Sequence, residues 1–342
     1  MLDPLLILGA STRAAASSAI RAGLSPLTAD LFCDDDLRQM SAKAKRIRNY
    51  PSDLPYLAQD FPPSAWMFTG GLENHPRIID TISSERDLLG TPAGPIRRVR
   101  DPWQLMQRLR HCGLLYPEVL RADQYAMIGR GSQNGWIRKP FRSAGGGNIQ
   151  LLSACRNVSQ NPESTILLAD QASSYYFQRV VEGQSQSAVF VAARGAAVLL
   201  GVTHQLIGTS WSGATGFRYA GSIGPLELTP SHISQWQRIG NGLANGFDLR
   251  GLFGVDAIVN DRGIWTIEVN PRYTSSIEVL EFGYEFHALT DHLIACRDGQ
   301  LNDRSPAVPA RFRGKAIIYA SCDVRIDDAF VSAARQANVK QS

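Results

Sequence analysis

The first hundred residues alternate short apolar runs with segments of helical pattern. Leu5 to Leu8 is a compact apolar run that predicts a buried strand, and a helix is expected from about Arg13 to Ala22. Trp66 to Thr69 predicts a later strand of the same kind. Strands that alternate with helices in this way indicate a mostly parallel sheet. We therefore expect a Rossmann-like α/β lobe over residues 1–98.

A second pattern, near the other end of the chain, predicts a β-hairpin. The apolar run from Phe253 to Val259 predicts one strand, and Ile264 to Val269 predicts the next. Asp261 to Gly263 is expected to close the hairpin as a three-residue loop, with its glycine in a left-handed conformation. Opposed residues of an antiparallel pair have numbers that add to a constant, so this loop places Asp256 opposite Glu268.

Three oxygen-bearing side chains therefore converge on one face of the hairpin. Strand side chains alternate, so Glu268 and Asn270 share the face that Asp256 also reaches. A half-exposed hairpin with its polar face in water is the usual reading of a lone acid in a strand. Here the acid lies in a nearly continuous apolar run, where a carboxylate is costly unless it is paired or bound to a metal. Hard cations such as Mg²⁺ prefer these ligands, and Arg272 adds a cation at the strand end.

A lysine on a predicted strand comes directly before a glycine-rich loop. Lys139 shares a strand face with Ile137 and Phe141, so it points partly into an apolar setting. Backbone amides of the loop that follows can cradle phosphate, because glycine lets the main chain approach closely. The candidate loop residues are Ser143, Gly145, Gly146 and Gly147. A flexible hairpin tip, with Lys139 reaching to the surface, is the alternative.

The N-terminal lobe offers candidate substrate contacts at the carboxyl ends of its strands, where open α/β sheets bind ligands. Ser11 and Thr12 follow the first strand, and Glu73 and Asn74 follow the later one. The alternative is that Asn74 simply starts the next helix. The dinucleotide fingerprint G-x-G-x-x-G lacks two of its glycines, which disfavours an oxidoreductase.

Composition narrows the class of protein. The chain has 342 residues, 44% hydrophobic and 19% charged, with a net charge of +4 and no basic block, so we expect no nucleic-acid partner. Its five cysteines are odd in number and form no CxxC, which favours a reducing compartment without a disulfide framework. We find no signal peptide or membrane span and expect a cytoplasmic protein, with homodimerisation left open.

The order of these features is similar to a known family. An α/β lobe, a strand with K-P before a glycine loop, an apolar hinge ending in E-G, and V-D…E-V-N-P-R follow one another. This order resembles the ATP-grasp superfamily, and within it the carboxylate–amine ligases, over residues 1 to about 300. The resemblance implies an α/β (α+β) fold with ATP enclosed between two α+β lobes. The implied parts are a small lobe over 99–173, a large lobe over 174–305, and a C-terminal strand and tail over 306–342.

The resemblance also implies roles for particular residues. Lys139 would meet ATP phosphate under a lid loop from Ser143 to Gly147, and Asp256, Glu268 and Asn270 would hold Mg²⁺, or Mn²⁺ in its place. The hinge residues implied to bind adenine are Gln178, Arg179, Val180 and Val181.

The chain departs from the family pattern at two places. Many members have a second ATP-binding lysine after an Asp at a helix start, where this chain has Pro102. Arg97, Arg98 or Arg100, just before that helix, is expected to replace it. The ribose-binding acid after the hinge is also missing, because Gln184 to Gln186 stand there.

Two segments, Phe217 to Leu226 and Tyr273 to Ser276, are most similar to a group that includes tyramine–glutamate ligases. This similarity adds Ser275 to the expected substrate contacts. The expected reaction is amide formation between a small-molecule carboxylate and an amine through an acyl phosphate, with Lys139 and Arg272 stabilising the developing charge. The alternative is a nucleotide-binding module without catalysis.

Overall fold

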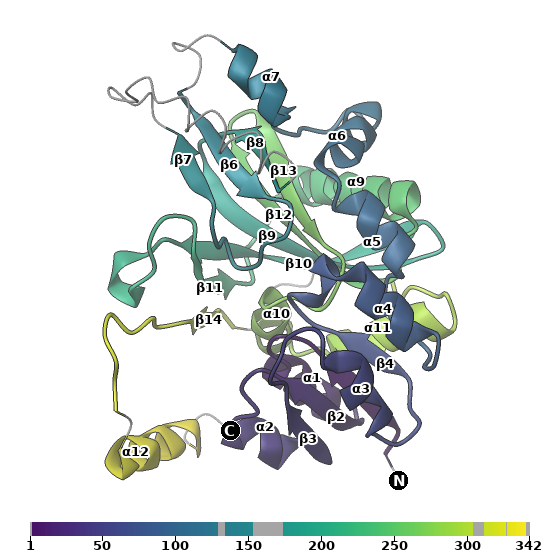
Figure 1. The fold of residues 1–342 in the computed structure, drawn as a ribbon. Coiled ribbons are helices and arrows are strands. Elements are labelled where there is room, and N and C mark those ends of the chain that lie inside the picture. Colours follow the sequence, from purple (N-terminus) through teal and green to yellow (C-terminus); the bar gives the residue numbers. More distant parts are fainter. Residues whose placement is uncertain (1, 129–133, 153–173, 304–310, 326, 340–342) are drawn as a thin grey trace.

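The structure is a computed structural model that describes residues 2–128, 134–152, 174–303, 311–325 and 327–339. Within these residues the strands form three sheets, which we call the N-terminal, small and large sheets. In Figure 1 the N-terminal sheet lies at the bottom, the small sheet at the upper left, and the large sheet between them. No helix in the described ranges is long and apolar enough to cross a bilayer.

The N-terminal sheet is parallel, with strand order β3-β2-β1-β4, as the alternating pattern predicts. Its strands are β1 (Pro4–Leu8), β2 (Ser25–Asp30), β3 (Lys43–Arg46) and β4 (Trp66–Phe68). The helices of this part are α1 (Arg13–Arg21), α2 (Asp35–Met40), α3 (Leu54–Gln59), α4 (Pro76–Ser83) and α5 (Ala93–Val99), with a 3₁₀ turn, η1, at Leu72–Asn74. Buried Leu and Ile side chains of β1 form its core.

The small sheet has the order β5-β8-β6-β7 and is antiparallel at each pairing. It consists of β5 (Val119–Leu120), β6 (Trp136–Pro140), β7 (Gln150–Leu152) and β8 (Tyr175–Arg179), and α6 (Pro102–His111) and α7 (Ala122–Met127) come before β6. The domain boundaries stay predictions, but β8 hydrogen-bonds to β6. A domain boundary at residue 174 therefore assigns β8 to the large lobe, although β8 is hydrogen-bonded to β6 in the small sheet.

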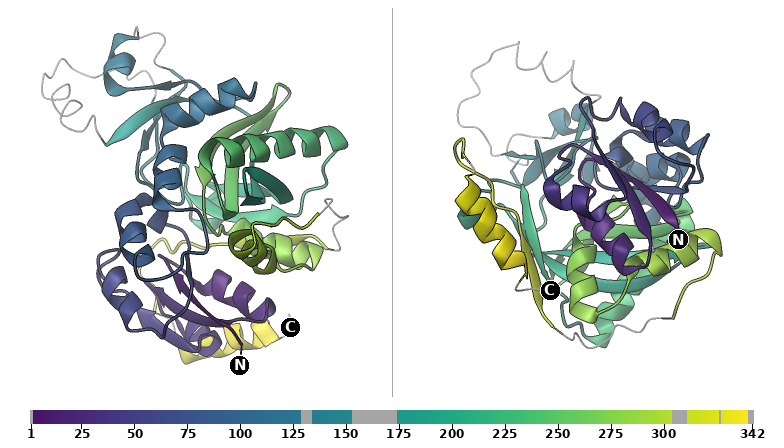
Figure 2. Two further views of the ribbon diagram at one scale, coloured as in Figure 1. Left: turned by 90° about the vertical axis from the view of Figure 1, so that its right-hand side faces the viewer. Right: turned by 90° about the horizontal axis from the view of Figure 1, so that it is seen from below.

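The large sheet has the order β13-β12-β9-β10-β11-β14. Its strands are β9 (Gln184–Ala193), β10 (Ala196–Ile207), β11 (Tyr219–Gly224), β12 (Gly251–Asn260), β13 (Gly263–Asn270) and β14 (Arg313–Ala316), with a 3₁₀ turn, η3, at Ser210–Ser212. Figure 2 shows α9 (Pro230–Phe247) on one face and α10 (Ser276–Tyr284) and α11 (Ala288–Arg297) on the other. Phe190 and Phe253 face α9, whereas Val189 and Leu252 face α10 and α11.

Two sequence expectations differ from the structure. The apolar pattern from Glu278 to Arg297 predicts one helix, but α10 ends at Tyr284, and the next residue, Glu285, has a left-handed φ of 56°. A left-handed residue ends a helix because the next amide can no longer continue the helical ladder. The tail is expected to fray from about Ala333, but α12 spans Asp328–Val339. The sequence from Asp303 to Arg311, which contains two prolines, is expected to be a linker, and its residues 304–310 lie outside the described residues.

Candidate active site

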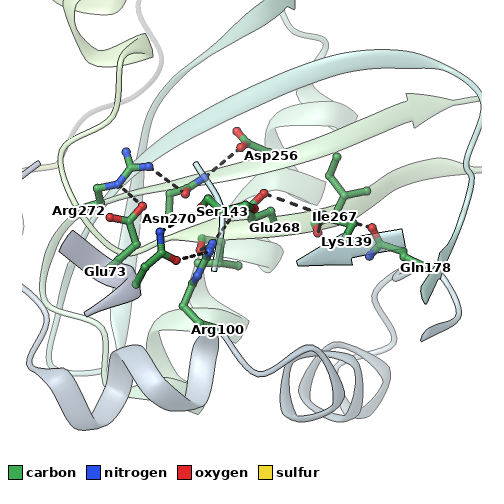
Figure 3. Close-up of polar contacts among 12 residues, drawn as sticks. Glu73, Arg100, Lys139, Ser143, Gln178, Asp256, Ile267, Glu268, Asn270 and Arg272 are labelled. Carbon is green, nitrogen blue, oxygen red and sulfur yellow. Dashed lines mark hydrogen bonds and ion pairs between the residues drawn. The ribbon is translucent and has the colours of Figure 1, made fainter. Parts of the chain in front are cut away.

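The small and large sheets meet at the site through one lysine and one glutamate. Lys139, on β6 of the small sheet, lies 3.9 Å from Glu268 Oε2 on β13 of the large sheet (Figure 3). Its Nζ also donates to Gln178 Oε1 and to the Ile267 carbonyl, each at 3.3 Å. Only 4% of Lys139 is exposed, so the alternative in which its ammonium reaches the surface is wrong.

Glu268 lies opposite Asp256, as expected, but the turn of the hairpin differs. Asn260 pairs with Gly263, which leaves a two-residue turn rather than the expected three-residue loop. A β-bulge at Ile267 supplies the extra residue that restores the Asp256–Glu268 pairing. The carbonyl of the bulged residue is the one that accepts from Lys139.

Arg100 supplies a second cation to Glu268. Its Nη1 donates to Glu268 Oε1, and its Nη2 donates to Asn74 Oδ1 at 3.2 Å. Of the three arginines expected to replace the missing lysine, Arg97 pairs with Asp80 and Arg98 with Asp248, both with exposed partners. Arg100 is therefore the one that the structure brings to the site.

The two cations set the protonation of Glu268. Burial alone raises the pKa of a carboxyl group, because it disfavours the charged form. Arg100 and Lys139 outweigh this effect, and the pKa of Glu268 lies below its ordinary value. The carboxylate is therefore ionised, and its negative charge is balanced by two protein cations.

The pKa of Asp256 is shifted in the opposite direction from that of Glu268. Asp256 Oδ1 accepts from Ser187 Oγ at 2.8 Å and from Gln205 Nε2 at 2.9 Å, and its Oδ2 accepts from Asn270 Nδ2 at 2.9 Å. Burial, and then the charge of Glu268, raise the pKa of Asp256 to about 6. Sequence reasoning missed Ser187 and Gln205. Both are polar residues at alternating positions of predicted strands, Ser187 on β9 and Gln205 on β10. Only the pairing of β9 with β12, and of β10 with β9, shows that their side chains point toward Asp256.

Arg272 joins the hairpin to the N-terminal lobe. Its Nε donates to Glu73 Oε1 at 2.7 Å, and its Nη2 donates to Asn270 Oδ1 at 3.1 Å. Glu73 is buried. A side chain at Gly70 would place its Cβ 3.3 Å from the Arg272 guanidinium carbon, so glycine gives the arginine room to reach Glu73. Figure 3 shows Arg272 and Glu73 together at the end of the cluster away from Lys139.

The glycine-rich loop is seated on the large sheet. Tyr219 N donates to the Gly145 carbonyl at 3.0 Å, and Asn74 Nδ2 donates to the Ser143 carbonyl at 3.1 Å. Gly146 has a φ of 74°, and an added Cβ would lie 1.8 Å from the Phe217 carbonyl oxygen. Glycine is therefore required here by both conformation and space. Gly147 closes the turn by donating to the Ala144 carbonyl at 3.2 Å.

The hinge residues lie beside this cluster. Gln178 is buried against Lys139, and its Nε2 has no hydrogen-bond partner among the described residues. Arg179 is exposed and donates to the Asn134 carbonyl, and Val180 N donates to the Gly135 carbonyl at 2.8 Å. Val181 follows, half-buried.

Three expected substrate contacts stand apart from the cluster. Thr12 is buried, and both its amide and its hydroxyl donate to Asp30 Oδ2. Ser11 is exposed, and its carbonyl accepts from Thr69. Ser275 precedes α10, on the side of the large sheet that carries Asp256. We call the group formed by Glu73, Asn74, Arg100, Lys139, Asp256, Glu268, Asn270 and Arg272 the ionic cluster. The structure thus includes Glu73 and Asn74 in this cluster, but not Ser11 and Thr12.

The oxygen ligands fit a hard divalent cation. Asp256 and Glu268 face each other across two strands, and the amide of Asn270 lies beside them. Their mutual repulsion contributes to the raised pKa of Asp256, and a cation between them would relieve it. No group of three or more His, Cys, Asp or Glu side chains suited to a metal occurs among the described residues. Two carboxylates with water and phosphate oxygens are nevertheless the usual magnesium environment.

Comparisons with known proteins place this geometry in a family. A family model described as an ATP-grasp domain matches residues 99–276, which is just over half of the chain. The matched range contains every residue of the ionic cluster except Glu73 and Asn74. The chain belongs to the ATP-grasp family. No curated protein matches it.

Solved structures share the fold of this ATP-grasp chain at low sequence identity. The biotin carboxylase domain of Hydrogenobacter thermophilus 2-oxoglutarate carboxylase is 16% identical with a TM-score of 0.68, covering 90% of this chain and 72% of that one. N5-carboxyaminoimidazole ribonucleotide synthetase from Thermus thermophilus is 14% identical with a TM-score of 0.67, covering 91% and 82%. Biotin carboxylase from Campylobacter jejuni is 12% identical with a TM-score of 0.68, covering 89% and 72%.

Proposed function

We propose that this ATP-grasp protein joins a carboxylate to an amine, with ATP converted to ADP and phosphate. The observation that carries the proposal is the ionic cluster, in which Arg100, Lys139 and Arg272 surround the carboxylates of the β12–β13 hairpin. Such a density of buried cations suits a polyanionic ligand. The Hydrogenobacter neighbour was crystallised with MgADP and bicarbonate, which supports a nucleotide and a carboxylate in this fold.

The nucleotide would lie between the small and large sheets. A pocket there is lined by Arg100, Lys139, Ser143, Tyr176 and Glu268. Its phosphates would meet Lys139, Arg100 and the amides of the loop from Ser143 to Gly147. The adenine would reach the hinge, Gln178 to Val181, where the unpartnered Gln178 Nε2 is a ready donor.

Asp256, Glu268 and Asn270 would hold magnesium, which neutralises phosphate charge when bound. Arg100 and Lys139 now neutralise Glu268. A cation at Glu268 would take over that role and free both side chains for phosphate oxygens. Metal and nucleotide should therefore bind together more strongly than either binds alone.

The reaction is a phosphoryl transfer followed by an acyl transfer. A substrate carboxylate oxygen attacks the γ-phosphorus, and ADP leaves. The amine nitrogen then attacks the acyl carbon, phosphate leaves with that oxygen, and the nitrogen loses a proton. Lys139 and Arg272 stay positively charged and stabilise the negative charge that develops in both steps. The seated glycine loop would keep water from the acyl phosphate.

Hydroxylamine tests this proposal without knowledge of the natural amine, because it converts acyl phosphates to hydroxamates. The protein is incubated with Mg²⁺, ATP, hydroxylamine and a panel of carboxylic acids, and ADP and hydroxamate are measured together. We expect both products to appear in equal amounts with some acids and to be lost in Glu268→Gln. Tight Mg²⁺–ATP binding without ADP release for any acid would favour a binding module instead.

A further inference from the structure

A surface cavity of about 550 Å³ lies in the N-terminal lobe and shares no residue with the ionic cluster or the nucleotide pocket. It lies between the end of β3 and α3, and its lining residues are Lys45, Arg46, Ile47, Arg48 and Leu57. Both elements are at the end of the molecule away from the small sheet (Figure 1). The volume is within the range of small-molecule sites, about 300–1,000 Å³. We call it the basic cavity.

The backbone that carries the two arginines is held in place. Ile47 is buried, and its amide donates to the Asp30 carbonyl at 2.7 Å, which continues the pairing of β3 with β2 past the last strand residue. Arg48 N donates to Asp53 Oδ2 at 3.2 Å, just before α3. Arg46 and Arg48 flank the buried residue and are exposed, so their side chains point away from the core.

The charge of this region is not balanced. Residues 43–60 contain four cations and two carboxylates, an excess of two positive charges in a chain whose net charge is only +4. Lys45 is paired with Asp60. Neither Arg46 nor Arg48 forms an ion pair with a carboxylate among the described residues, although the charge of Arg48 acts on Asp53. Arg46 donates only its Nε, to the Leu31 carbonyl at 3.2 Å, so the Nη groups of both arginines are available to an anion.

Protection of a sheet edge accounts for only part of this charge. β3 is the outer strand of the N-terminal sheet and pairs with β2 alone among the described strands. Cationic side chains on an edge strand discourage pairing with another chain, and Lys43 and Lys45 suit that role. Arg48 does not, because it lies two residues after the end of β3 and lines the basic cavity.

We propose that the basic cavity binds a small molecule through a phosphomonoester group, which Arg46 and Arg48 hold. A phosphomonoester carries nearly two negative charges at neutral pH, which matches the excess of two positive charges. Guanidinium groups donate parallel hydrogen bonds to phosphate oxygens, and this geometry favours phosphate over halide ions. Leu57 and Ile47 give the cavity an apolar part, against which the body of the ligand packs.

The charge of the ligand predicts a specific pH dependence. A phosphomonoester loses its second negative charge below a pKa of about 6, whereas the lysine and arginine side chains stay charged. The amide of Asn49 lowers the pKa of Asp53, and Lys45 lowers that of Asp60, so both carboxylates stay ionised down to pH 5. Affinity for a phosphomonoester should therefore rise about tenfold between pH 5 and pH 7.5, as its doubly charged fraction does.

Phenyl phosphate and phenyl sulfate form a matched pair of probes, because the sulfate ester has a similar shape but only one negative charge. Calorimetry is run at fixed ionic strength, with Mg²⁺ and a non-hydrolysable ATP analogue present to occupy the nucleotide pocket. We expect phenyl phosphate to bind one-to-one and to saturate at millimolar concentration. It should bind more tightly than phenyl sulfate at pH 7.5, and only phenyl phosphate should show the tenfold pH dependence.

Variants locate the binding. Arg46→Gln and Arg48→Gln should each weaken phenyl phosphate roughly tenfold, the usual effect of one lost hydrogen bond between charged groups, with little change in melting because both side chains are exposed. Lys43→Gln is the matched control, because it removes a cation of the same strand that does not line the cavity. Lys43→Gln, and Lys139→Met in the nucleotide pocket, should bind phenyl phosphate as wild type does.

Four outcomes would overturn the proposal. They are no saturable binding of phenyl phosphate, equal affinity for the two probes at pH 7.5, equal weakening by Lys43→Gln and Arg48→Gln, and tighter binding of a single-stranded oligonucleotide than of phenyl phosphate. The third would show that only general positive charge attracts the anion, and the fourth that the cavity serves a nucleic-acid backbone. These measurements do not depend on the ligase reaction, so a failure to form hydroxamate would leave this site unaffected.

Discussion

Replacement of Asp256 by Asn should make the ligand-free protein more stable at pH 8. The reason is that burial and Glu268 raise the pKa of Asp256 from 3.8 to about 6. A raised carboxyl pKa means that the folded state holds the proton more tightly than the unfolded state. At pH 8 both states are ionised, and the ionised folded state carries the full cost, about 3 kcal/mol for a shift of about two pKa units. Asn removes the charge and keeps the shape, but its NH2 group faces the Asn270 amide that donates to Asp256 Oδ2, so the net gain is smaller than this cost.

This gain has a defined pH dependence. The destabilisation caused by ionised Asp256 is complete above the pKa that Asp256 has in the folded state. It disappears as the pH falls from about 6 to about 4, where the carboxyl group of the unfolded state also takes up the proton. At pH 4.5 the same two pKa values leave only about 1 kcal/mol. Thermal and urea unfolding of wild type and Asp256→Asn, without metal, at pH 8, 6 and 4.5 measures the difference.

Glu268→Gln is the matched control because its carboxylate faces the first one across the hairpin. Arg100 and Lys139 lower the pKa of Glu268, so loss of its charge leaves two buried cations without their partner. This variant should be less stable than wild type at pH 8, and the loss should shrink as the pH falls through the lowered pKa. Equal destabilisation by both variants at pH 8, or a gain for Asp256→Asn that does not change with pH, would refute the electrostatic reasoning.

Three further predictions concern the nucleotide site. Lys139→Met should lower the rate of ADP formation by roughly a hundred- to a thousandfold, as is typical when one preorganised charge is removed, and a near wild-type rate would contradict its role. Asn74→Ala removes the donor to the Ser143 carbonyl, so amide hydrogen exchange across 143–147 should speed up, and unchanged exchange would show that Asn74 does not hold the loop. Mg²⁺–ATP affinity should fall about tenfold per pH unit below pH 6, because the cation must displace the proton on Asp256, and a flat calorimetric profile from pH 5 to 7 would contradict this.

The sequence was most informative where local pattern and chemistry agree. A carboxylate in an apolar run has few explanations, so Asp256 could be assigned to a buried site before its partners were known. The pairing with Glu268 was predicted from a three-residue loop that does not exist. It holds because the bulge at Ile267 adds back the residue that the tighter turn removes. Bulges depend on neighbouring strands, and here the bulged carbonyl accepts from Lys139 of another sheet.

Long-range contacts account for what sequence reasoning could not decide. Arg97, Arg98 and Arg100 are equivalent as sequence, and only the folded structure shows that Arg100, at the end of α5, reaches Glu268 on β13. Helix propensity likewise gives little warning that Glu285 adopts a left-handed conformation.

Transfer of isotope from the acid to phosphate tests the central claim most directly. An acid that supports ADP formation is labelled with ¹⁸O in its carboxylate, and the phosphate released in the presence of Mg²⁺–ATP and an amine is analysed by mass spectrometry. If the carboxylate attacks the γ-phosphorus, each phosphate formed should carry one ¹⁸O atom from the acid. Phosphate without ¹⁸O, formed together with amide from the labelled acid, would contradict an acyl phosphate intermediate.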